Sequence, residues 1–337
     1  MMTGLDRRTL LGSATGVLVA SITPIGARAQ GRPLTFVTPF GYIMAYADVL
    51  VAREGGHFAK QGLNVTMQAG RGSAQAVQQI LSGQAMFSRT GGVDLMKAVA
   101  NEGAPIVSVA VITQGSPFFV VSKKGPGQIA TPKDMVGKTI GVISKGGATE
   151  NLLDIMLANA GVDPKSVPRE TVGNAPGAYG LIEQGRIQAY IISIGSWIAL
   201  KRQNVAMHSW NTDDFAPIPG QVYITSEAIA EKEQDTIVRF LKAVDAAMQD
   251  IHAPGGYDRA LQLVKPYEIA EAKDAEGAKQ GLHEESQLWI SAGEKNRLRH
   301  VPEAWAKGAD QMLKAGVIKS APVEKFYTNK FIDLARG

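Results

Sequence analysis

Residues 138–157 of this chain, KTIGVISKGGATENLLDIML, decide its fold class. The run from Thr139 to Ile143 is short, apolar and rich in β-branched residues, which is typical of a buried strand. A glycine-rich turn follows and includes Gly146 and Gly147. An apolar stripe at helical spacing comes next and consists of Leu152, Leu153, Met156 and Leu157. The stretch therefore predicts a strand, a turn and a helix in that order, the repeating unit of α/β folds.

The turn inside this stretch is a candidate anion site. The start of a helix presents backbone N–H groups without partners and a partial positive charge. Gly146 and Gly147 would let a ligand come close to the backbone. The spacing is neither that of a P-loop nor that of a dinucleotide-binding turn, and an ordinary tight turn is the open alternative.

The composition limits the classes of function. With 337 residues, 45 % of them hydrophobic, the chain is long enough for one large or two medium domains. The net charge is only +4, and half of it lies in residues 1–29, so we expect no nucleic-acid partner. The absence of cysteine excludes disulfides, thiolate metal sites, a cysteine nucleophile and a lipoprotein signal. The five histidines lack helical pairing, so we expect neither a metal site nor a cofactor.

The N-terminus has the pattern of a secretory signal peptide. Arg7 and Arg8 precede an apolar run from Leu10 to Ile22, which is too short to span a bilayer, and Ala27-Arg28-Ala29 follows. We assign residues 1–29 to a signal peptide that is cleaved at its end, and we expect a soluble, exported periplasmic protein without a lipid anchor. The paired arginines resemble a twin-arginine signal, with an ordinary secretion signal as the alternative.

Strand and helix patterns alternate along the rest of the chain. The expected strands cover residues 34–38, 63–67, 85–87, 105–112, 118–122, 139–143, a segment near 170, 187–192 and 221–225. The expected helices cover 43–53, a segment capped by Ser73, 93–100, 149–160, 176–184, 196–202 and a long segment that ends near 251. Residues 88–92 are expected to be the turn after the third strand. This alternation predicts mostly parallel sheets with helices on both faces.

The order of elements starts again after Gly115-Ser116-Pro117. The sequence of residues 80–85 resembles that of residues 181–189. The longer regions that contain these two segments share the same order of strands and helices. We interpret the copies as two lobes of the same kind, with chance similarity between two α/β units as the alternative. The C-terminal part is helical and charged, and apolar residues there, such as Leu288 and Trp289, are expected to pack.

Four stretches give the chain a family resemblance. They are the opening strand with its Pro39 turn, the run EGGHFAKQGLNV at 54–65, the Gly83-Gln84-Ala85 step and the run KDMVGKTIGV at 133–142. Over about residues 33–250 the chain resembles the solute-binding proteins of ABC importers for sulfonate, nitrate, taurine and thiamine-pyrimidine precursors, which carry SsuA/THI5-like domains. It departs from many relatives at Gln188, where they have an acidic residue.

The resemblance implies a bilobed periplasmic-binding-protein fold of type II, an α/β fold in which two doubly wound lobes are joined by a two-strand hinge. Lobe one would comprise residues 33–117 plus 222–337, and lobe two residues 118–221. Strands near 118–121 and 222–225 would form the hinge. A ligand would bind between the lobes at the carboxyl ends of the strands, as the rule for open α/β sheets also predicts. The lobes would close around it.

The turns that converge on this cleft supply the candidate ligand-binding residues. Their helix N-termini and hydroxyl groups offer hydrogen-bond donors to an anion. The candidates are Pro39, Tyr42, Ser73, Arg89, Thr90, Gly91, Gln114, Ser144, Gly146, Gly147, Ala148, Thr149, Ser196 and Trp197.

Arg89 is the strongest single candidate for a residue that binds an anionic ligand. Arginine pairs bidentately with carboxylate, sulfonate or nitrate, and a buried guanidinium needs such a partner. The alternative is that Arg89 points outward or pairs with Asp94. Tyr42 and Trp197 would provide flat apolar walls for an organic ligand, with ordinary packing between the lobes as the alternative.

We therefore predict the periplasmic substrate-binding subunit of an ABC importer. It would act as a monomer that captures a small organic anion, sulfonate- or carboxylate-like, and delivers it to an inner-membrane permease. A binding protein for a thiamine-type pyrimidine precursor and a ligand sensor are the alternatives. A pyrimidine-synthase-like enzyme is disfavoured, because those enzymes carry a cysteine-rich motif and this chain has no cysteine, so we expect no catalytic residues.

Overall fold

The computed structural model describes residues 33–337. The predicted signal peptide, residues 1–29, lies outside the described residues. None of the helices between residues 33 and 337 is both long and apolar enough to cross a membrane.

The first sheet has five strands in the order β2-β1-β3-β10-β4. They are β1 (Leu34–Thr38), β2 (Val65–Ala69), β3 (Phe87–Gly91), β4 (Ile106–Val111) and β10 (Gln221–Ser226). β1 pairs in parallel with β2 and β3, whereas β10 runs antiparallel to β3 and β4. The chain thus returns to this sheet only after it has completed the second one.

The second sheet also has five strands, in the order β7-β6-β8-β5-β9. They are β5 (Phe118–Lys123), β6 (Ile140–Val142), β7 (Arg169–Thr171), β8 (Ala189–Ser193) and β9 (Met207–Asn211). β6 is parallel to β7 and β8, and β5 is antiparallel to β8 and β9. β9 was not predicted, because it is an edge strand in which only Trp210 is buried, so its apolar signal is weak.

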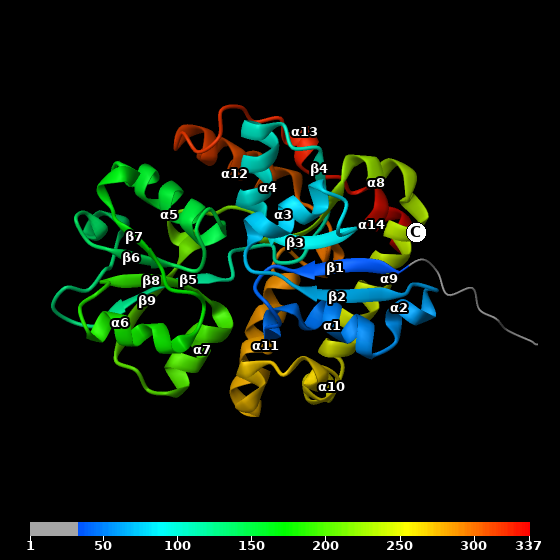
Figure 1. The fold of residues 1–337 in the computed structure, drawn as a ribbon, viewed down its shortest axis with the longest axis horizontal. Coiled ribbons are helices and arrows are strands. Elements are labelled where there is room, and N and C mark those ends of the chain that lie inside the picture. Colours follow the sequence, from blue (N-terminus) through cyan, green and yellow to red (C-terminus); the bar gives the residue numbers. More distant parts are fainter. Residues whose placement is uncertain (1–32) are drawn as a thin grey trace, which may run out of the picture. The chain divides into compact units, whose positions relative to one another are not determined.

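Helices cover both faces of each sheet (Figure 1). They are α1 (Ala47–Glu54), α2 (His57–Lys60), α3 (Ser73–Leu81), α4 (Gly92–Glu102), α5 (Ala148–Asn159), α6 (Tyr179–Glu183), α7 (Ile194–Arg202), α8 (Glu227–Lys232), α9 (Gln234–His252), α10 (Gly256–Leu263), α11 (Ala275–Trp289), α12 (Pro302–Lys314), α13 (Val323–Phe326) and α14 (Lys330–Arg336). On the first sheet α3 and α4 pack on one face, and α1, α2 and α9 on the other. On the second sheet α5 packs on one face, and α6 and α7 on the other. The expected two-lobed α/β fold is confirmed.

The chain crosses between the two sheets at residues 112–117 and 212–220. The two crossing segments lie side by side, since the Gly220 N–H donates to the Thr113 carbonyl at 3.2 Å. A Cβ atom on Gly220 would collide with the carbonyl oxygen of Gly115, so glycine is required for this close approach.

The position of the hinge stays a prediction. The strands near 118–121 and 222–225 were expected to form it, yet each of them pairs only within one sheet. The segments 112–117 and 212–220, which belong to neither sheet, are the connections that a lobe movement would bend.

Strand β3 differs from the prediction in a way that matters for the site. Residues 88–92 were predicted to be a turn, but Ser88, Arg89, Thr90 and Gly91 continue the strand and are fully buried. They pair with the antiparallel strand β10, and the Ser88 hydroxyl donates to the Val37 carbonyl at 2.9 Å. The prediction was wrong because polar residues were taken to end the strand, whereas their polar atoms find partners inside the fold. Similarly, Gly72 caps α3, and Ser73 is its first residue.

Aromatic residues form the centre of the core beneath the first sheet. The Phe240 ring on α9 lies 4.3 Å from that of Phe87, 5.3 Å from Phe58, 5.4 Å from Tyr223 and 6.0 Å from Phe36, measured between centroids. All five side chains are buried. Packing around Phe240 therefore joins α9 to α2, β1, β3 and β10.

We expect Phe240→Ala to lower the free energy of unfolding by about 3–5 kcal/mol, because it removes a buried ring and leaves a cavity. Urea unfolding measures the loss. Leu334→Ala, at a side chain that is 56 % exposed, is the control and should change stability by less than about 0.5 kcal/mol. A loss below about 1 kcal/mol for Phe240→Ala would contradict the central role of this ring.

Candidate functional site

A small cavity lies between the two sheets. Its volume is about 20 Å³, and it is lined by Phe40, Ile43, Ala45, Tyr46, Arg89, Pro117, Phe118, Ile143, Asn174, Ser193, Gln221 and Glu285. Ile143 follows the carboxyl end of β6 and Ser193 ends β8, so the cavity lies where ligands bind in open α/β sheets. This volume holds about one water molecule, so a ligand of several heavy atoms requires the lobes to move apart.

Arg89 is the centre of a buried ionic cluster at this cavity. Its Nη2 donates to Glu285 Oε1 on α11 at 3.0 Å, and its Nη1 lies 3.5 Å from Asp48 Oδ1 on α1. The guanidinium also donates to the Ala45 carbonyl at 2.6 Å and to Gln221 Oε1 at 3.4 Å. All three charged side chains are at most 1 % exposed. We call Asp48, Arg89 and Glu285 the ionic cluster.

The ionic cluster contains more acid than base. Burial raises the pKa of Glu285 to about 7, against the opposing effect of Arg89, and it also raises the pKa of Asp48. Burial alone would lower the pKa of Arg89, but the two carboxylates outweigh it and raise that pKa, so the guanidinium stays charged. The hydroxyl of Tyr223 donates to the second oxygen of Asp48. One cation therefore faces two carboxyl groups in a dry environment.

Two buried polar atoms at the cavity have no hydrogen-bond partner: Glu285 Oε2 and Tyr46 Oη. Tyr46 lies in the single turn Met44–Tyr46, and the Arg89 guanidinium carbon is 5.0 Å from the centroid of its ring. Burial raises the pKa of Tyr46, so this hydroxyl stays neutral. Because a buried polar atom without a partner costs free energy, these two atoms are available to a ligand.

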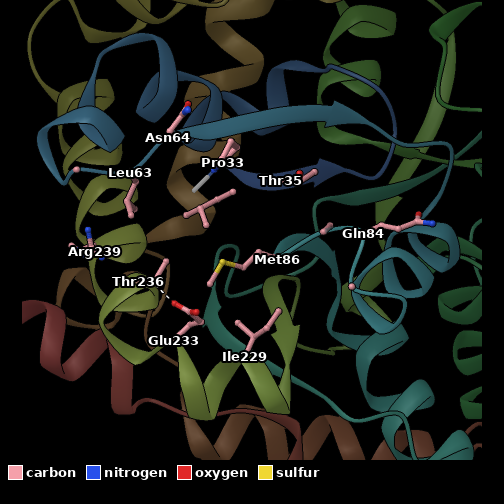
Figure 2. A pocket seen from close by; sticks show the side chains of 14 residues that line it. Pro33, Thr35, Leu63, Asn64, Gln84, Met86, Ile229, Glu233, Thr236 and Arg239 are labelled. Carbon is pink, nitrogen blue, oxygen red and sulfur yellow. Dashed lines mark hydrogen bonds between the residues drawn. The ribbon is translucent and has the colours of Figure 1, made fainter. Parts of the chain in front are cut away.

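A wider pocket of about 480 Å³ lies at the opposite end of the first sheet (Figure 2). Thr35 at the start of β1 and Asn64 just before β2 line it. Its charged residues are paired within the chain: Arg239 with Asp235 at 2.8 Å, and Glu233 with the Thr236 hydroxyl at 3.0 Å. The Nε of Arg239 in this pocket is also buried without a partner. We prefer the smaller cavity as the candidate site because it lies at the carboxyl ends of the strands.

Comparison with known proteins gives the family of the chain. A family model described as NMT1/THI5 like matches residues 44–254. The chain belongs to the NMT1/THI5-like family. No curated protein matches it by sequence.

Solved structures with this fold come from several binding proteins. A protein from Bordetella bronchiseptica has a TM-score of 0.75 at 19 % identity, and the match covers 90 % of this chain and 96 % of that one. The alkanesulfonate-binding protein SsuA of Xanthomonas axonopodis, bound to MOPS, has a TM-score of 0.63 at 16 % identity, covering 89 % and 99 %. The periplasmic nitrate-binding protein NrtA of Synechocystis has a TM-score of 0.67 at 10 % identity, covering 90 % and 88 %. The NMT1/THI5-like chain therefore has the fold of periplasmic binding proteins of ABC importers.

Of the predicted site residues in this NMT1/THI5-like protein, Arg89 lines the cavity. It was chosen because a buried guanidinium needs an anionic partner, and the chain itself supplies two such partners, Asp48 and Glu285. The alternative pairing with Asp94 does not occur. Arg89 can therefore contact a ligand, but its charge is already balanced.

A second group of predicted residues meets where α4 contacts α5. Asp94 accepts hydrogen bonds from Asn151 Nδ2 at 2.6 Å and from Thr90 Oγ1 at 3.3 Å, and Lys97 Nζ donates to Asn151 Oδ1 at 2.6 Å. Burial raises the pKa of Asp94 to about 6, while bonds from Asn151, Ser73 and Thr90 oppose the rise. The residues in or beside this contact are Ser73, Thr90, Gly91, Ser144, Gly146, Gly147, Ala148 and Thr149. Asp94 and Lys97 join the lobes here through Asn151, and the residues named above lie outside the cavity lining.

The donors at the start of α5 are partly used within the chain. The Gly146 N–H donates to the Glu150 carboxylate, and the Thr149 hydroxyl accepts from the Ile143 N–H at 3.0 Å. The glycine-rich turn that suggested an anion site is thus partly satisfied by its own helix.

The remaining predicted residues also lie outside the cavity lining. Tyr42 packs on Tyr267, with ring centroids 4.7 Å apart, and Trp197 stacks on Phe119 at 4.2 Å. Gln114 donates to carbonyls in the C-terminal part, Ser196 donates to the Asn174 carbonyl, and Pro39 is buried beside the lining residue Phe40. The aromatic residues that line this cavity are Phe40, Tyr46 and Phe118, whereas a ligand contact of Tyr42 or Trp197 stays a prediction.

Sequence reasoning missed the two residues with unpartnered atoms. Glu285 lies on α11, in the part of the chain that was read as packing. One signal was present: Leu282, Glu285, Ser286 and Trp289 share one face of the helix, and a carboxylate on an otherwise buried stripe is unusual. Tyr46 lies within a segment that was predicted to be a helix, where an aromatic residue is expected to belong to the hydrophobic core.

We expect Arg89→Ala to lower the free energy of unfolding by about 3–5 kcal/mol, because it leaves two buried carboxyl groups without a cation. Urea unfolding at neutral pH tests this. Arg186→Ala, which removes an exposed pair with Glu170, is the control and should cost at most about 1 kcal/mol. Equal stability of the two variants would contradict the ionic cluster.

The raised pKa of Glu285 predicts a pH effect on stability. Between the usual carboxyl pKa of 4.5 and about 7, the folded protein holds a proton on Glu285 that the unfolded chain has lost, so this stabilising contribution is lost as pH rises through 7. Glu285→Gln removes the titration and keeps an acceptor oxygen for Arg89. We therefore expect the difference in Tm between Glu285→Gln and the parent protein to shift in favour of the variant from pH 5 to pH 8, as measured by scanning calorimetry. Glu284→Gln on the same helix is the control, and a constant difference for Glu285→Gln would contradict the assignment.

Proposed function

We propose that this protein is the substrate-binding component of an ABC importer, working as a monomer in a bacterial periplasm and delivering its ligand to a membrane permease. The observation that carries the proposal is the cavity between two doubly wound lobes, with two buried polar atoms that await a partner. The family and the fold of the similar structures support it. Export rests on the predicted signal peptide at residues 1–29.

Ligand capture would proceed by movement of the lobes, which we propose comprise residues 33–117 plus 222–337 and residues 118–221. Polar contacts join them on both sides of the cavity: Asp94 with Asn151 at 2.6 Å, and Arg202 with Asp274 at 2.9 Å. These polar contacts can break and reform, and the packing of α7 on α11 would have to part with them, because the cavity is too small for an organic ligand to enter while they hold.

The class of ligand has two candidates. The sequence favoured a small organic anion, sulfonate- or carboxylate-like, bound by Arg89. Such an anion would have to share Arg89 with the two carboxyl groups of the ionic cluster, which already balance its charge. A ligand that donates hydrogen bonds fits the unpartnered carboxylate oxygen better, and this class includes the pyrimidine precursors that were the alternative from sequence.

We propose binding without catalysis. The fold by itself does not decide this, because one fold can carry both binding proteins and enzymes. The chain offers no cysteine as a nucleophile, and a ligand sensor would differ from a transport component only in its membrane partner.

A thermal-shift screen of residues 30–337 tests the proposal. The panel contains sulfonates, taurine, nitrate, aromatic carboxylates, amines, amidines and aminopyrimidines. A ligand at 100 times its Kd stabilises the fold by about 2.7 kcal/mol and raises Tm clearly. Mass spectrometry should recover the ligand unchanged.

Two half-buried aromatic residues provide a matched pair of variants for this screen. Phe40→Ala, at the cavity, should reduce the ligand-induced shift, and Trp197→Ala, outside the lining, should leave it intact. Silence across the panel, conversion of the ligand, or an equal effect of both variants would contradict a binding component with its site in this cavity.

A further inference from the structure

We propose that the cavity recognises a nitrogen base, a protonated amine or amidine on a small apolar body, whose N–H groups bind Glu285 Oε2 and Tyr46 Oη. This inference rests on the proposed binding function and names its ligand class. It assigns a ligand-binding residue to α11, a helix that otherwise packs against α7 and α10.

The first support is the pair of unpartnered atoms. Glu285 is 1 % exposed and its Oε1 is occupied by Arg89, while its Oε2 has no hydrogen-bond partner. Tyr46 is equally buried; the Phe40 backbone N–H lies near its Oη, and its O–H finds no acceptor. Above its pKa of about 7 Glu285 is ionised and its Oε2 accepts hydrogen bonds only, so at pH 8 the natural partner of this oxygen is an N–H or O–H of the ligand.

The second support is the charge around Glu285. The ionisable groups that act on it are Arg89 from β3, Asp48 from α1 and Glu271 from the turn Ala270–Lys273. Glu271 is half-buried and accepts a hydrogen bond from the Met44 N–H at 2.8 Å. Two carboxyl groups thus contact the one guanidinium, and a third acts on Glu285, so when these carboxyl groups are ionised an added anion would meet repulsion and an added cation would be attracted.

The third support is the use that Arg89 already makes of its donors. Nε donates to Gln221, Nη1 serves Ala45 and Asp48, and Nη2 serves Glu285. A bidentate pair with a ligand anion needs two donors on one edge of the guanidinium, and each edge here already serves the protein.

The rest of the lining selects the body of the ligand. Phe40, Ile43, Phe118 and Ile143 present apolar surface. The amide of Asn174 is already occupied, since it accepts from the Ser193 N–H at 3.0 Å and donates to the Ser193 hydroxyl at 2.8 Å. A small planar or aliphatic body therefore fits opposite the polar end.

Four compounds with the same phenyl body test the inference by calorimetric titration: benzamidine, benzamide, benzoate and benzenesulfonate. We expect benzamidine to bind at least tenfold more tightly than either anion. Glu285→Gln should weaken benzamidine at least tenfold and Tyr46→Phe severalfold, because each removes one partner of the amidinium. Glu284→Gln, on the same helix but outside the lining, should leave the affinity unchanged.

Tighter binding of benzoate or benzenesulfonate than of benzamidine would overturn the inference and leave the binding function standing. The inference would also be overturned if Glu285→Gln and Tyr46→Phe, both shown by circular dichroism to be folded, bound benzamidine as tightly as the parent protein does. Failure of all four compounds at millimolar concentration would also overturn it, whereas the proposed function fails only if the wider ligand screen is silent as well.

Discussion

The buried contact between Arg89 and the carboxyl groups of Asp48 and Glu285 holds lobe one together at the cavity. It joins α1, β3 and α11, three elements that are far apart in the sequence, and Gln221 adds β10. Because each charge is removed from water, the loss of Arg89 would leave both carboxyl groups without a cation. The C-terminal part of the chain is thereby fixed at the rim of the cavity.

This constraint also shapes the chemistry of the site. The protein uses four of the five N–H donors of Arg89 and leaves one oxygen of Glu285 without a partner, so when Glu285 is ionised the polar end of the cavity offers a free acceptor. On either side, contacts such as Asp94 with Asn151 join the lobes through neutral amides and single ion pairs. The interior of lobe one is therefore held firmly, while the contacts between the lobes are of a kind that can separate.

Much of the fold could be predicted from the sequence, because apolar periodicity and glycine-rich turns such as Gly146-Gly147 are local signals. The two-lobed architecture and nearly every strand followed from them. The site followed less well, since it depends on contacts between distant residues. Arg89 was selected for the right physical reason, the need of a buried guanidinium for an anion, but its partner Glu285 lies 196 residues away and no local pattern joins the two. The end of strand β3 was predicted too early for the same reason, because the partners of its polar residues lie in other elements.

Arg89 and Glu285 stabilise the fold as a pair. A double-mutant cycle of the free energy of unfolding, with Arg89→Gln, Glu285→Gln and the double variant, measures that coupling directly. We expect a favourable coupling above about 1 kcal/mol, as contacting members of one network show. Effects that add to within about 0.5 kcal/mol would contradict it, because they would mean that the two side chains act independently.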